Sequence, residues 1–450
     1  MDFNQIHKIF FLGIGGIGMS ALARYFKHQG KAIFGYDLTS TPLTEELIAE
    51  GMSIQFDEQI SSIPSDIDLV IYTPAIPNEN KLFIHFQNGK VPLFKRSKVL
   101  GLLSEEKFTI AIGGTHGKTS ISAITAHLLK SAELPITAIV GGICKNYNSN
   151  VILSAESKYM ILEADEFDRS FLTLKPDVAV ISSMDADHLD VYENKNKLID
   201  SFKDFARLIK SDGTLICYSK LRNEFPIADN VLFYGIDENA DIIAKNIRIE
   251  NGSFVFDFKA CEMTIQNINI SVPGLHYIEN ATAAMAVGYK LGLNESQLKK
   301  GIESFSGVER RFEIRYDSGP VYIDDYAHHP EEIRVTIEAV RMLYPGKKIT
   351  GVFQPHLYSR TRDFADEFAA SLSKLDEIIL LEIYPAREKT MAGVSSAMIL
   401  DKIDNPNKQI LDKIELLSYV EEFTNGVLLT IGAGDIGLMA QKFEKIFKKR

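Results

Sequence analysis

The segment Gly113–Thr119 (GGTHGKT) combines glycines, a lysine and a hydroxyl side chain between an apolar run and a helical pattern. The backbone amides of such a loop surround phosphate oxygens, its lysine neutralises the outer phosphates and its hydroxyl binds Mg²⁺. Lys118 and Thr119 fit the last two roles. The loop is a variant, because Ile112 stands where the general motif has its first glycine. The segment predicts a site for ATP or GTP.

Two acidic clusters could hold a divalent cation beside that loop. Glu163–Asp168 (EADEFD) ends one expected strand, and Asp185–Asp190 (DADHLD) follows another. The carboxyl ends of parallel strands are where open α/β sheets bind ligands. Carboxylates with an imidazole suit Mg²⁺ or Mn²⁺ held against phosphates. For any single aspartate the alternative is a helix cap or a solvated turn.

A second glycine-rich segment, Gly13–Gly18 (GIGGIG), also lies between an expected strand and an expected helix. Glycines allow a sharp turn and a close approach to a diphosphate, which then lies at the helix N-terminus. Asp37 ends the next strand, the usual place for an acid that binds ribose. The pattern predicts a nucleotide diphosphate, for which a redox dinucleotide is the usual occupant. A tight turn without a ligand is the alternative.

The last third of the chain carries the histidine and arginine motifs Asp324–Pro330 (DDYAHHP) and Gln354–Asp363 (QPHLYSRTRD). Arg360 and Arg362 could grip a carboxylate with paired hydrogen bonds. Equally, the arginines could be surface charges beside a helix capped by Asp363. His328 and His329 could be a base, a metal pair or ordinary packed histidines.

These motifs need elements to position them, and short apolar runs alternating with helical patterns predict a parallel α/β sheet. Around the Asn251–Gly252 turn, residues 247–258 predict a hairpin, and with it a small antiparallel sheet in the middle of the chain. The polar segment 97–107 indicates a domain junction. Expected strands span 7–12, 32–37, 68–73, 109–113, 159–163, 178–182, 321–325, 349–353, 378–382 and 427–432, and expected helices 19–29, 277–291, 331–343, 363–373 and 438–447.

Length and composition set wider limits. The 450 residues suggest about three domains, and a formal charge of −11 argues against a nucleic-acid partner. There is no run of about 18 or more apolar residues, so membrane insertion is not expected. Three separated cysteines without metal-binding spacing fit a reducing cytoplasm.

In order and spacing, the motifs together resemble the Mur ligases over nearly the whole chain. The similar segments are GIGGIGM (13–19), GTHGKT (114–119), EADEFDRSF (163–171), DADHLD (185–190), RRFE (310–313), DDYAHHP (324–330), FQPHLYSRTRD (353–363) and GAGDIG (432–437). The resemblance implies a UDP-binding Rossmann-like domain at 1–105, a central P-loop ATPase domain at 106–312 and a Rossmann-like domain that binds an amino acid at 313–450.

The resemblance also implies an activity. Within the family the motifs are most similar to those of enzymes that join L-alanine to UDP-N-acetylmuramate with ATP and Mg²⁺, through an acyl phosphate. The alternative is the ligase that recycles murein tripeptide, in which we expect a different segment in place of FQPHLYSRTRD. A redox enzyme would leave the P-loop unused, a nucleotide switch would not need an amino acid, and folylpolyglutamate-type ligases lack the N-terminal glycine domain. We expect a monomer or a weak homodimer.

Roles for individual residues follow from the same resemblance. Lys118, Glu163 and His188 would be catalytic, and Thr119 and Glu163 would bind one Mg²⁺ and His188 a second. ATP would be held by Gly114, Thr115, His116, Gly117, Lys118, Thr119, Ser120, Asn280, Arg311 and Asp325, the UDP-sugar by Gly13, Gly15, Gly16, Gly18, Asp37 and Thr73, and the amino acid by Arg360 and Arg362. Tyr277 departs from the family pattern, which has asparagine after the histidine. Lys203 lies near the place of a carbamylated lysine in some relatives, and we assign it no role.

Overall fold

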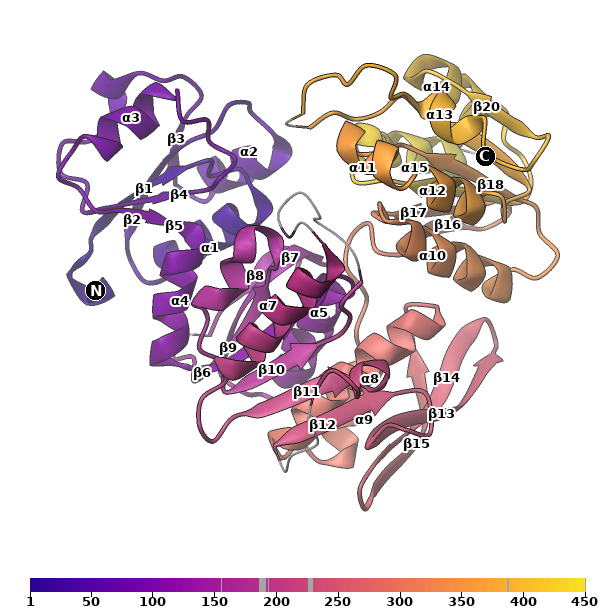
Figure 1. Cartoon of the computed structure of the whole chain (residues 1–450), viewed down its shortest axis with the longest axis horizontal. Helices are drawn as coiled ribbons and strands as arrows, with labels where there is room; N and C mark the ends of the chain where they lie inside the picture. Colours follow the sequence, from indigo (N-terminus) through magenta and orange to yellow (C-terminus); the bar gives the residue numbers. More distant parts are fainter. Residues whose placement is uncertain (155, 186–191, 193, 226–229, 387, 450) are drawn as a thin grey trace. The chain divides into compact units, whose positions relative to one another are not determined.

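The computed structural model describes residues 1–154, 156–185, 192, 194–225, 230–386 and 388–449. Three sheets with flanking helices make up the chain (Figure 1), which confirms the predicted α/β class. The chain divides into two compact units, Met1–Lys245 with Asp257–Ile268 and Glu279–Phe305, and Asn246–Phe256 with Asn269–Ile278 and Ser306–Arg450. The domain boundaries after residues 105 and 312 stay predictions.

The N-terminal sheet has five parallel strands in the order β3-β2-β1-β4-β5. Its central strand is buried from Ile9 to Leu12, as expected for a parallel strand covered on both faces. The strands are β1 (Lys8–Leu12), β2 (Ala32–Tyr36), β3 (Ser53–Gln55), β4 (Leu69–Tyr72) and β5 (Leu93–Lys95), and the helices are α1 (Ile17–His28), α2 (Pro42–Ala49) and α3 (Lys81–Gln87).

The segment 97–107, expected to be a polar junction between domains, lies mostly in helix α4 (Arg96–Glu106). Lys98, Glu105 and Glu106 are exposed, while Val99, Leu100 and Leu103 are buried in the hydrophobic core that extends through the first unit. The apolar side chains form one buried face of a helix, which the polar composition of the segment did not reveal. The domain boundary at this place stays a prediction.

The central sheet has ten strands in the order β15-β14-β13-β12-β11-β10-β6-β9-β7-β8. The strands at its centre run parallel, so their carboxyl ends share one edge. They are β6 (Phe108–Gly113), β7 (Ile136–Cys144), β8 (Ser149–Ile152), β9 (Tyr159–Ala164), β10 (Val178–Ile181), β11 (Thr214–Tyr218) and β12 (Val231–Gly235). The helices are α5 (Lys118–Ser131), α7 (Lys195–Arg207), α8 (Leu275–Lys290) and α9 (Glu295–Glu303).

The predicted hairpin is present, with β13 (Ile242–Glu250) and β14 (Ser253–Ala260) joined by Asn251 and Gly252. Both turn residues have positive φ, 50° and 76°, as a type I′ turn requires. The strands that follow the parallel part of the central sheet are continuous with it, because β13 pairs in parallel with β12. Together with β15 (Met263–Ile270), these strands therefore extend the central sheet.

The C-terminal sheet has six strands in the order β16-β17-β21-β18-β19-β20, in which the described edge pair β16–β17 is antiparallel and the other neighbouring strands run parallel. The helix expected from residue 363 is two helices that meet at Phe364. The strands are β16 (Glu313–Asp317), β17 (Val321–Asp325), β18 (Ile349–Phe353), β19 (Glu377–Leu380), β20 (Lys408–Ile410) and β21 (Val427–Ile431), with helices α10 (Pro330–Leu343), α11 (Tyr358–Asp363), α12 (Ala365–Leu372), α13 (Ser396–Leu400), α14 (Lys413–Glu422) and α15 (Ala440–Lys448).

Candidate active site

The loop Gly114–Gly117 connects β6 to α5 and has the backbone geometry that phosphate binding needs. Gly114 and Gly117 have φ angles of 134° and 83°, which residues other than glycine rarely adopt. A Cβ on Gly114 would lie 2.1 Å from Ser182 Oγ, so a larger residue would also collide there. The loop therefore presents backbone amides at the N-terminus of α5, where an anion is stabilised.

The loop lysine is held by a buried carboxylate. Lys118 Nζ lies 2.7 Å from Glu166 Oε2 and donates to the Gly114 carbonyl oxygen at 2.7 Å. Burial raises the pKa of Glu166 to about 7, although Lys118 opposes that shift. Burial also lowers the pKa of Lys118, but the carboxylates of Glu166, Asp165 and Glu163 together raise it above its usual value. The lysine is consequently a buried ammonium ion aimed at the phosphate loop.

Two serines that the sequence did not reveal brace the loop from the end of β10. Ser183 Oγ accepts from the backbone N–H of His116 at 2.8 Å and bonds to Thr115 Oγ1 at 2.9 Å. Ser182 Oγ donates to the carbonyl oxygen of His116. In the sequence, these serines were marked only by their position after a buried strand. Residues of an ordinary turn occupy the same kind of position.

Glu163 lies where a cation beside the phosphates would be bound. Thr119 Oγ1 donates to Glu163 Oε2 at 3.3 Å, and the Gly141 N–H donates to Glu163 Oε1 at 2.6 Å. A hydroxyl and a carboxylate fit Mg²⁺, which keeps several waters and phosphate oxygens as its other ligands. Among the described residues, no group of three or more acidic, histidine or cysteine side chains is arranged to hold a metal ion. His188, the third predicted ligand, lies outside those residues.

Asn280 on α8 reaches the same loop from a distant part of the chain. It is buried, and its Oδ1 would lie 2.8 Å from a Cβ placed on Gly117. The structure therefore brings Asn280 beside the phosphate loop. Contact with the base of ATP, which the resemblance implies, stays a prediction.

The N-terminal glycine loop also gathers its predicted partners. Gly13 has a φ of 84°, and a Cβ there would lie 2.6 Å from the methyl group of Thr73. The Gly15 N–H donates to Asp37 Oδ2 at 2.7 Å, so this carboxylate fixes the loop. Thr73 and Asp37 therefore flank the turn that opens α1, as the motif predicted.

Arg96, the first residue of α4, is a further cation at this loop that the sequence analysis missed. A Cβ on Gly18 would lie 2.5 Å from Arg96 Nη1, and Arg96 Nη2 lies 3.8 Å from Asp165 Oδ2. A guanidinium beside a glycine loop suits a diphosphate. The only sequence signal was the run of basic residues that we assigned to a junction.

In the second unit, the buried carboxylate of Asp325 lies close to the half-buried Arg311 and feels its charge. Asp325 accepts from the N–H groups of Phe312 and Ala327, at 2.8 and 2.7 Å. Burial raises the pKa of Asp325 to about 6, while Arg311 opposes the shift. Burial likewise lowers the pKa of Arg311, but Glu332 and Asp325 more than offset that and raise it. The two residues predicted to reach ATP are thus close together.

Arg360 and Arg362, which were predicted to bind the amino-acid substrate, differ in how exposed they are. Arg360 is buried, whereas the Arg362 side chain is half exposed and its Nε donates to Asp363 at 2.6 Å. Leu357, between His356 and α11, has a φ of 72° and a ψ of 137°, a strained conformation for a branched residue. Such strain collects at functional sites, and it lies on the segment that carries Arg360.

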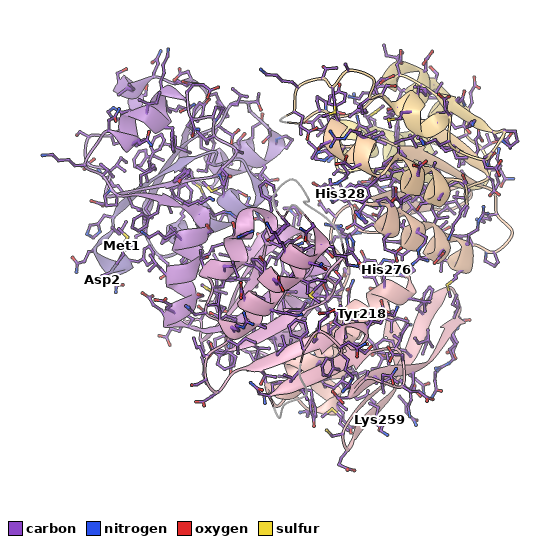
Figure 2. The ribbon with its side chains drawn as sticks, viewed as in Figure 1. Met1, Asp2, Tyr218, Lys259, His276 and His328 are labelled. Carbon is purple, nitrogen blue, oxygen red and sulfur yellow. The ribbon has the colours of Figure 1, made fainter. Side chains whose placement is uncertain are left out.

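The adjacent histidines His328 and His329 are in different surroundings. His329 caps α10 by accepting from the Glu331 N–H through Nδ1. His328 lies 6.3 Å from His356, measured between ring centroids. Figure 2 labels His328 and also His276, whose pKa is lowered to about 4 by burial. His329 is therefore at least a structural cap, and it also lies 5.1 Å from the ring of Phe364, which ends α11. Both histidines thus lie near the segment that carries Arg360.

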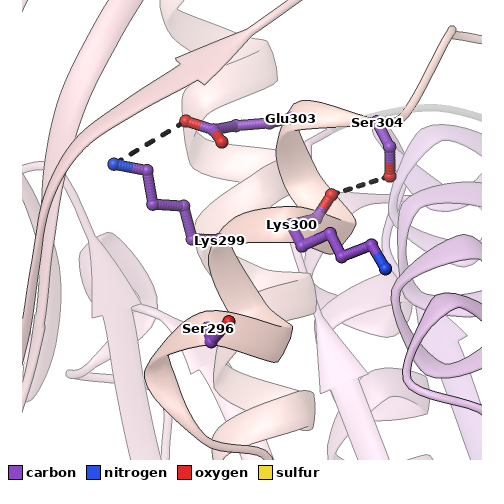
Figure 3. A pocket seen from close by; sticks show the side chains of 5 residues that line it. All are labelled: Ser296, Lys299, Lys300, Glu303 and Ser304. Atoms are coloured by element: carbon purple, nitrogen blue, oxygen red, sulfur yellow. Dashed lines mark hydrogen bonds and ion pairs between the residues drawn. The ribbon is translucent and has the colours of Figure 1, made fainter.

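A shallow pocket elsewhere carries no part of this chemistry. It is lined by one face of α9, and there Lys299 lies 3.8 Å from Glu303 while Ser304 Oγ donates to the Lys300 carbonyl oxygen (Figure 3). No predicted site residue lines it. Helix-surface charges already paired in this way are typical of a solvated face.

A phosphate loop with a buried lysine, an adjacent carboxylate–hydroxyl pair and a separate glycine loop define a P-loop nucleotide-binding α/β protein. Three family profiles match the chain, the Mur ligase family catalytic domain at 8–108, the Mur ligase middle domain at 112–288 and the Mur ligase glutamate ligase domain at 310–442. The chain belongs to the Mur ligase family.

Relatives and solved structures agree with that assignment. The chain is 46% identical over 451 residues to a UDP-N-acetylmuramate–L-alanine ligase of Christiangramia forsetii, covering 99% of this chain and 98% of the relative. It is 45% identical to that of Flavobacterium psychrophilum, with 99% of each covered. The crystal structure of UDP-N-acetylmuramate-alanine ligase MurC from Thermotoga maritima superposes with a TM-score of 0.83 at 27% identity, covering 98% of this chain and 99% of that one.

Within the described residues, none of the helices combines the length and apolar character that a bilayer crossing requires.

Proposed function

We propose that this chain joins L-alanine to UDP-N-acetylmuramate with hydrolysis of ATP to ADP and phosphate, a step of peptidoglycan precursor synthesis. The observation that carries the proposal is similarity at 45–46% identity over 99% of the chain to ligases named for this reaction. The P-loop, the Glu163–Thr119 pair and the separate N-terminal glycine loop supply the sites that the reaction needs. ATP and a UDP-sugar are cytoplasmic metabolites, so we place the enzyme in the cytoplasm.

The first chemical step would be attack of the lactoyl carboxylate on the γ-phosphate of ATP, giving an acyl phosphate and ADP. Lys118 would offset the charge that develops on the transferred phosphate, and the loop amides would hold its neighbours. When ATP binds, a phosphate oxygen would replace the Glu166 carboxylate as a hydrogen-bond acceptor of Lys118. The three N–H donors of the ammonium would then stay satisfied. The amine of L-alanine would then attack the acyl carbon, and phosphate would leave.

One Mg²⁺ would be held by Thr119 and Glu163, and a second by His188. When bound, the metal supplies positive charge that draws phosphate oxygens together and stabilises the transferring group. Gly141 would keep the Glu163 carboxylate aimed at the site through its 2.6 Å hydrogen bond.

We assign the amino-acid carboxylate to Arg360, with Arg362 as a secondary contact, because only Arg360 is buried. Arg311 and Asp325 would contribute to ATP binding from the second unit. The glycines of the N-terminal loop, Asp37 and Thr73 would hold the UDP diphosphate, with Arg96 as an added cation. Whether the chain is a monomer or a weak homodimer stays a prediction.

The alternative is the murein tripeptide ligase, whose fold this chain shares. The structure of a murein peptide ligase from Psychrobacter arcticus superposes with a TM-score of 0.71 at 21% identity. A competition assay with equal L-alanine and tripeptide, read by product mass, separates the two. We expect UDP-N-acetylmuramoyl-alanine as the dominant product, and a tripeptide product in its place would overturn the assignment.

A further inference from the structure

Strand β8 presents a buried asparagine to the first turns of α1. Asn150 is fully buried, and its Nδ2 donates to the carbonyl oxygen of Ile17 at 2.6 Å and to Ser20 Oγ at 3.0 Å. Its Oδ1 accepts from Arg24 Nη1 at 2.7 Å. One side chain of the central sheet thus bonds three successive points on the helix that the N-terminal glycine loop opens.

Arg24, the α1 residue that donates to Asn150, is itself fixed by ion pairs. Arg24 is 9% exposed and is paired with Glu50 at 2.6 Å and Glu46 at 3.0 Å, so its guanidinium has little freedom to leave Asn150. Ile17 follows Gly16, the last loop residue before α1. Moving Asn150 would therefore move the glycine loop or leave buried polar groups unbonded, which is costly.

The same hairpin contacts the metal-binding carboxylate. β7 and β8 pair at Ile139–Val151 and again at Cys144–Ser149, with a shift of register between them. Within that irregular stretch, the Gly141 N–H donates to the carboxylate oxygen Glu163 Oε1. Irregularities of this kind re-aim groups next to active sites.

A Cβ on Gly141 would lie 2.6 Å from Glu163 Oε2, so glycine is needed for this approach. The β7–β8 hairpin therefore touches the glycine loop helix through Asn150 and the carboxylate beside the P-loop through Gly141. β7 also pairs in parallel with β9, the strand that carries Glu163, so both contacts belong to one continuous part of the central sheet.

We propose that Asn150 is a positioning residue, which sets the UDP-binding loop relative to the ATP site so that occupancy of one favours the other. The inference rests on the proposed function, because it takes a UDP group as the ligand of the glycine loop. The link would bring the lactoyl carboxylate and the γ-phosphate into register before the transfer step.

The test measures the affinity of UDP by calorimetry, with and without Mg²⁺ and a non-hydrolysable ATP analogue. UDP lacks the lactoyl carboxylate, so it cannot touch the analogue and any coupling must pass through the protein. We expect the full-length wild-type protein to bind UDP at least about 5-fold more tightly when the analogue is present. In Asn150→Ala that ratio should fall below about 2.

Asn80→Ala is the matched control, because Asn80 is also buried but only caps α3 within the N-terminal domain. It should lower the melting temperature and keep the wild-type ratio. If Asn150→Ala does not fold, Asn150→Asp retains the bond from Arg24, loses both donated bonds and should also lower the ratio.

The outcomes are separable. A wild-type ratio near 1, or an unchanged ratio in both Asn150 variants, overturns the link while leaving the ligase assignment intact. Failure of the wild-type protein to bind UDP at all would overturn the proposed function, and the link with it.

Discussion

At the scale of single residues, Lys118 has the most demanding role. Its ammonium is buried and already bonded to Glu166 and to the Gly114 carbonyl oxygen, so it is positioned before any phosphate approaches. Because preorganised charge costs no rearrangement during the reaction, it contributes strongly to transition-state stabilisation. Loss of the ammonium should therefore act on turnover more than on folding.

We predict that Lys118→Ala lowers kcat by about 10²-fold or more, as loss of a preorganised donor does. Initial rates of phosphate release at saturating substrates measure this. Lys299→Ala is the control, since Lys299 lies on the surface of α9 and pairs with Glu303. Near-normal turnover in the Lys118 variant would remove the lysine from the mechanism.

Arg360 makes a separate prediction about the amino acid. Losing a charge-assisted bond to its carboxylate costs about 1.5–3 kcal/mol, so Arg360→Ala should raise KM for L-alanine about tenfold or more with little change in kcat. KM for ATP should stay near its wild-type value. Arg341→Ala is the control, because Arg341 pairs with Asp376 at 2.7 Å. An unchanged KM for L-alanine in the Arg360 variant would place the carboxylate elsewhere.

At the scale of elements, α4 is a core helix and not a linker. Leu103 is 1% exposed, so Leu103→Ala removes buried methyl groups and should lower the free energy of unfolding by about 2–5 kcal/mol. Urea titration followed by circular dichroism measures the change. Glu105 lies two residues further along α4 and is exposed, so Glu105→Ala should change the same quantity by less than about 0.5 kcal/mol. Equal effects of the two variants would contradict the packing.

His127 joins α5 to two neighbouring elements. Its Nδ1 and Nε2 lie 2.9 Å from Tyr147 Oη and from Ser304 Oγ, and burial lowers its pKa to about 4. An unfolded histidine titrates near pH 6.5, so between about pH 6.5 and 4 the unfolded chain binds a proton that the folded chain does not. Stability should therefore fall as the pH falls through this window, by up to about 1.4 kcal/mol per pH unit.

His127→Gln removes this titration, so the difference in unfolding free energy between wild type and variant isolates it. We expect that difference to shift in favour of the variant as the pH falls from 7 to 4.5. Parallel curves for the two proteins would mean that folding does not lower the pKa of His127.

At the scale of the whole molecule, the motifs predicted the phosphate loop, the glycine loop and their neighbours well because each lies between a strand and a helix. Gly114, Gly117 and Gly13 have the positive φ angles that their motifs require. The pairing of Lys118 with Glu166 was not predictable from local patterns. It exists because β6 and β9 are adjacent parallel strands, which brings residues far apart in the chain to one edge.

The features that the sequence did not reveal have related physical causes. The strands after residue 242 alternate as an antiparallel sheet does, but alternation does not tell that β13 pairs in parallel with β12 and so extends the central sheet. Arg96 and Ser183 act through positions that only the folded chain defines. Local periodicity reports which face of an element is buried, and not which other element covers it.

The most direct test of the central claim is phosphate release from ATP and Mg²⁺ in the presence of UDP-N-acetylmuramate and single amino acids. The account predicts release only when both the sugar nucleotide and L-alanine are present, with one UDP-N-acetylmuramoyl-alanine formed for each phosphate. Release that is independent of either substrate would contradict the account and indicate a nucleotide switch.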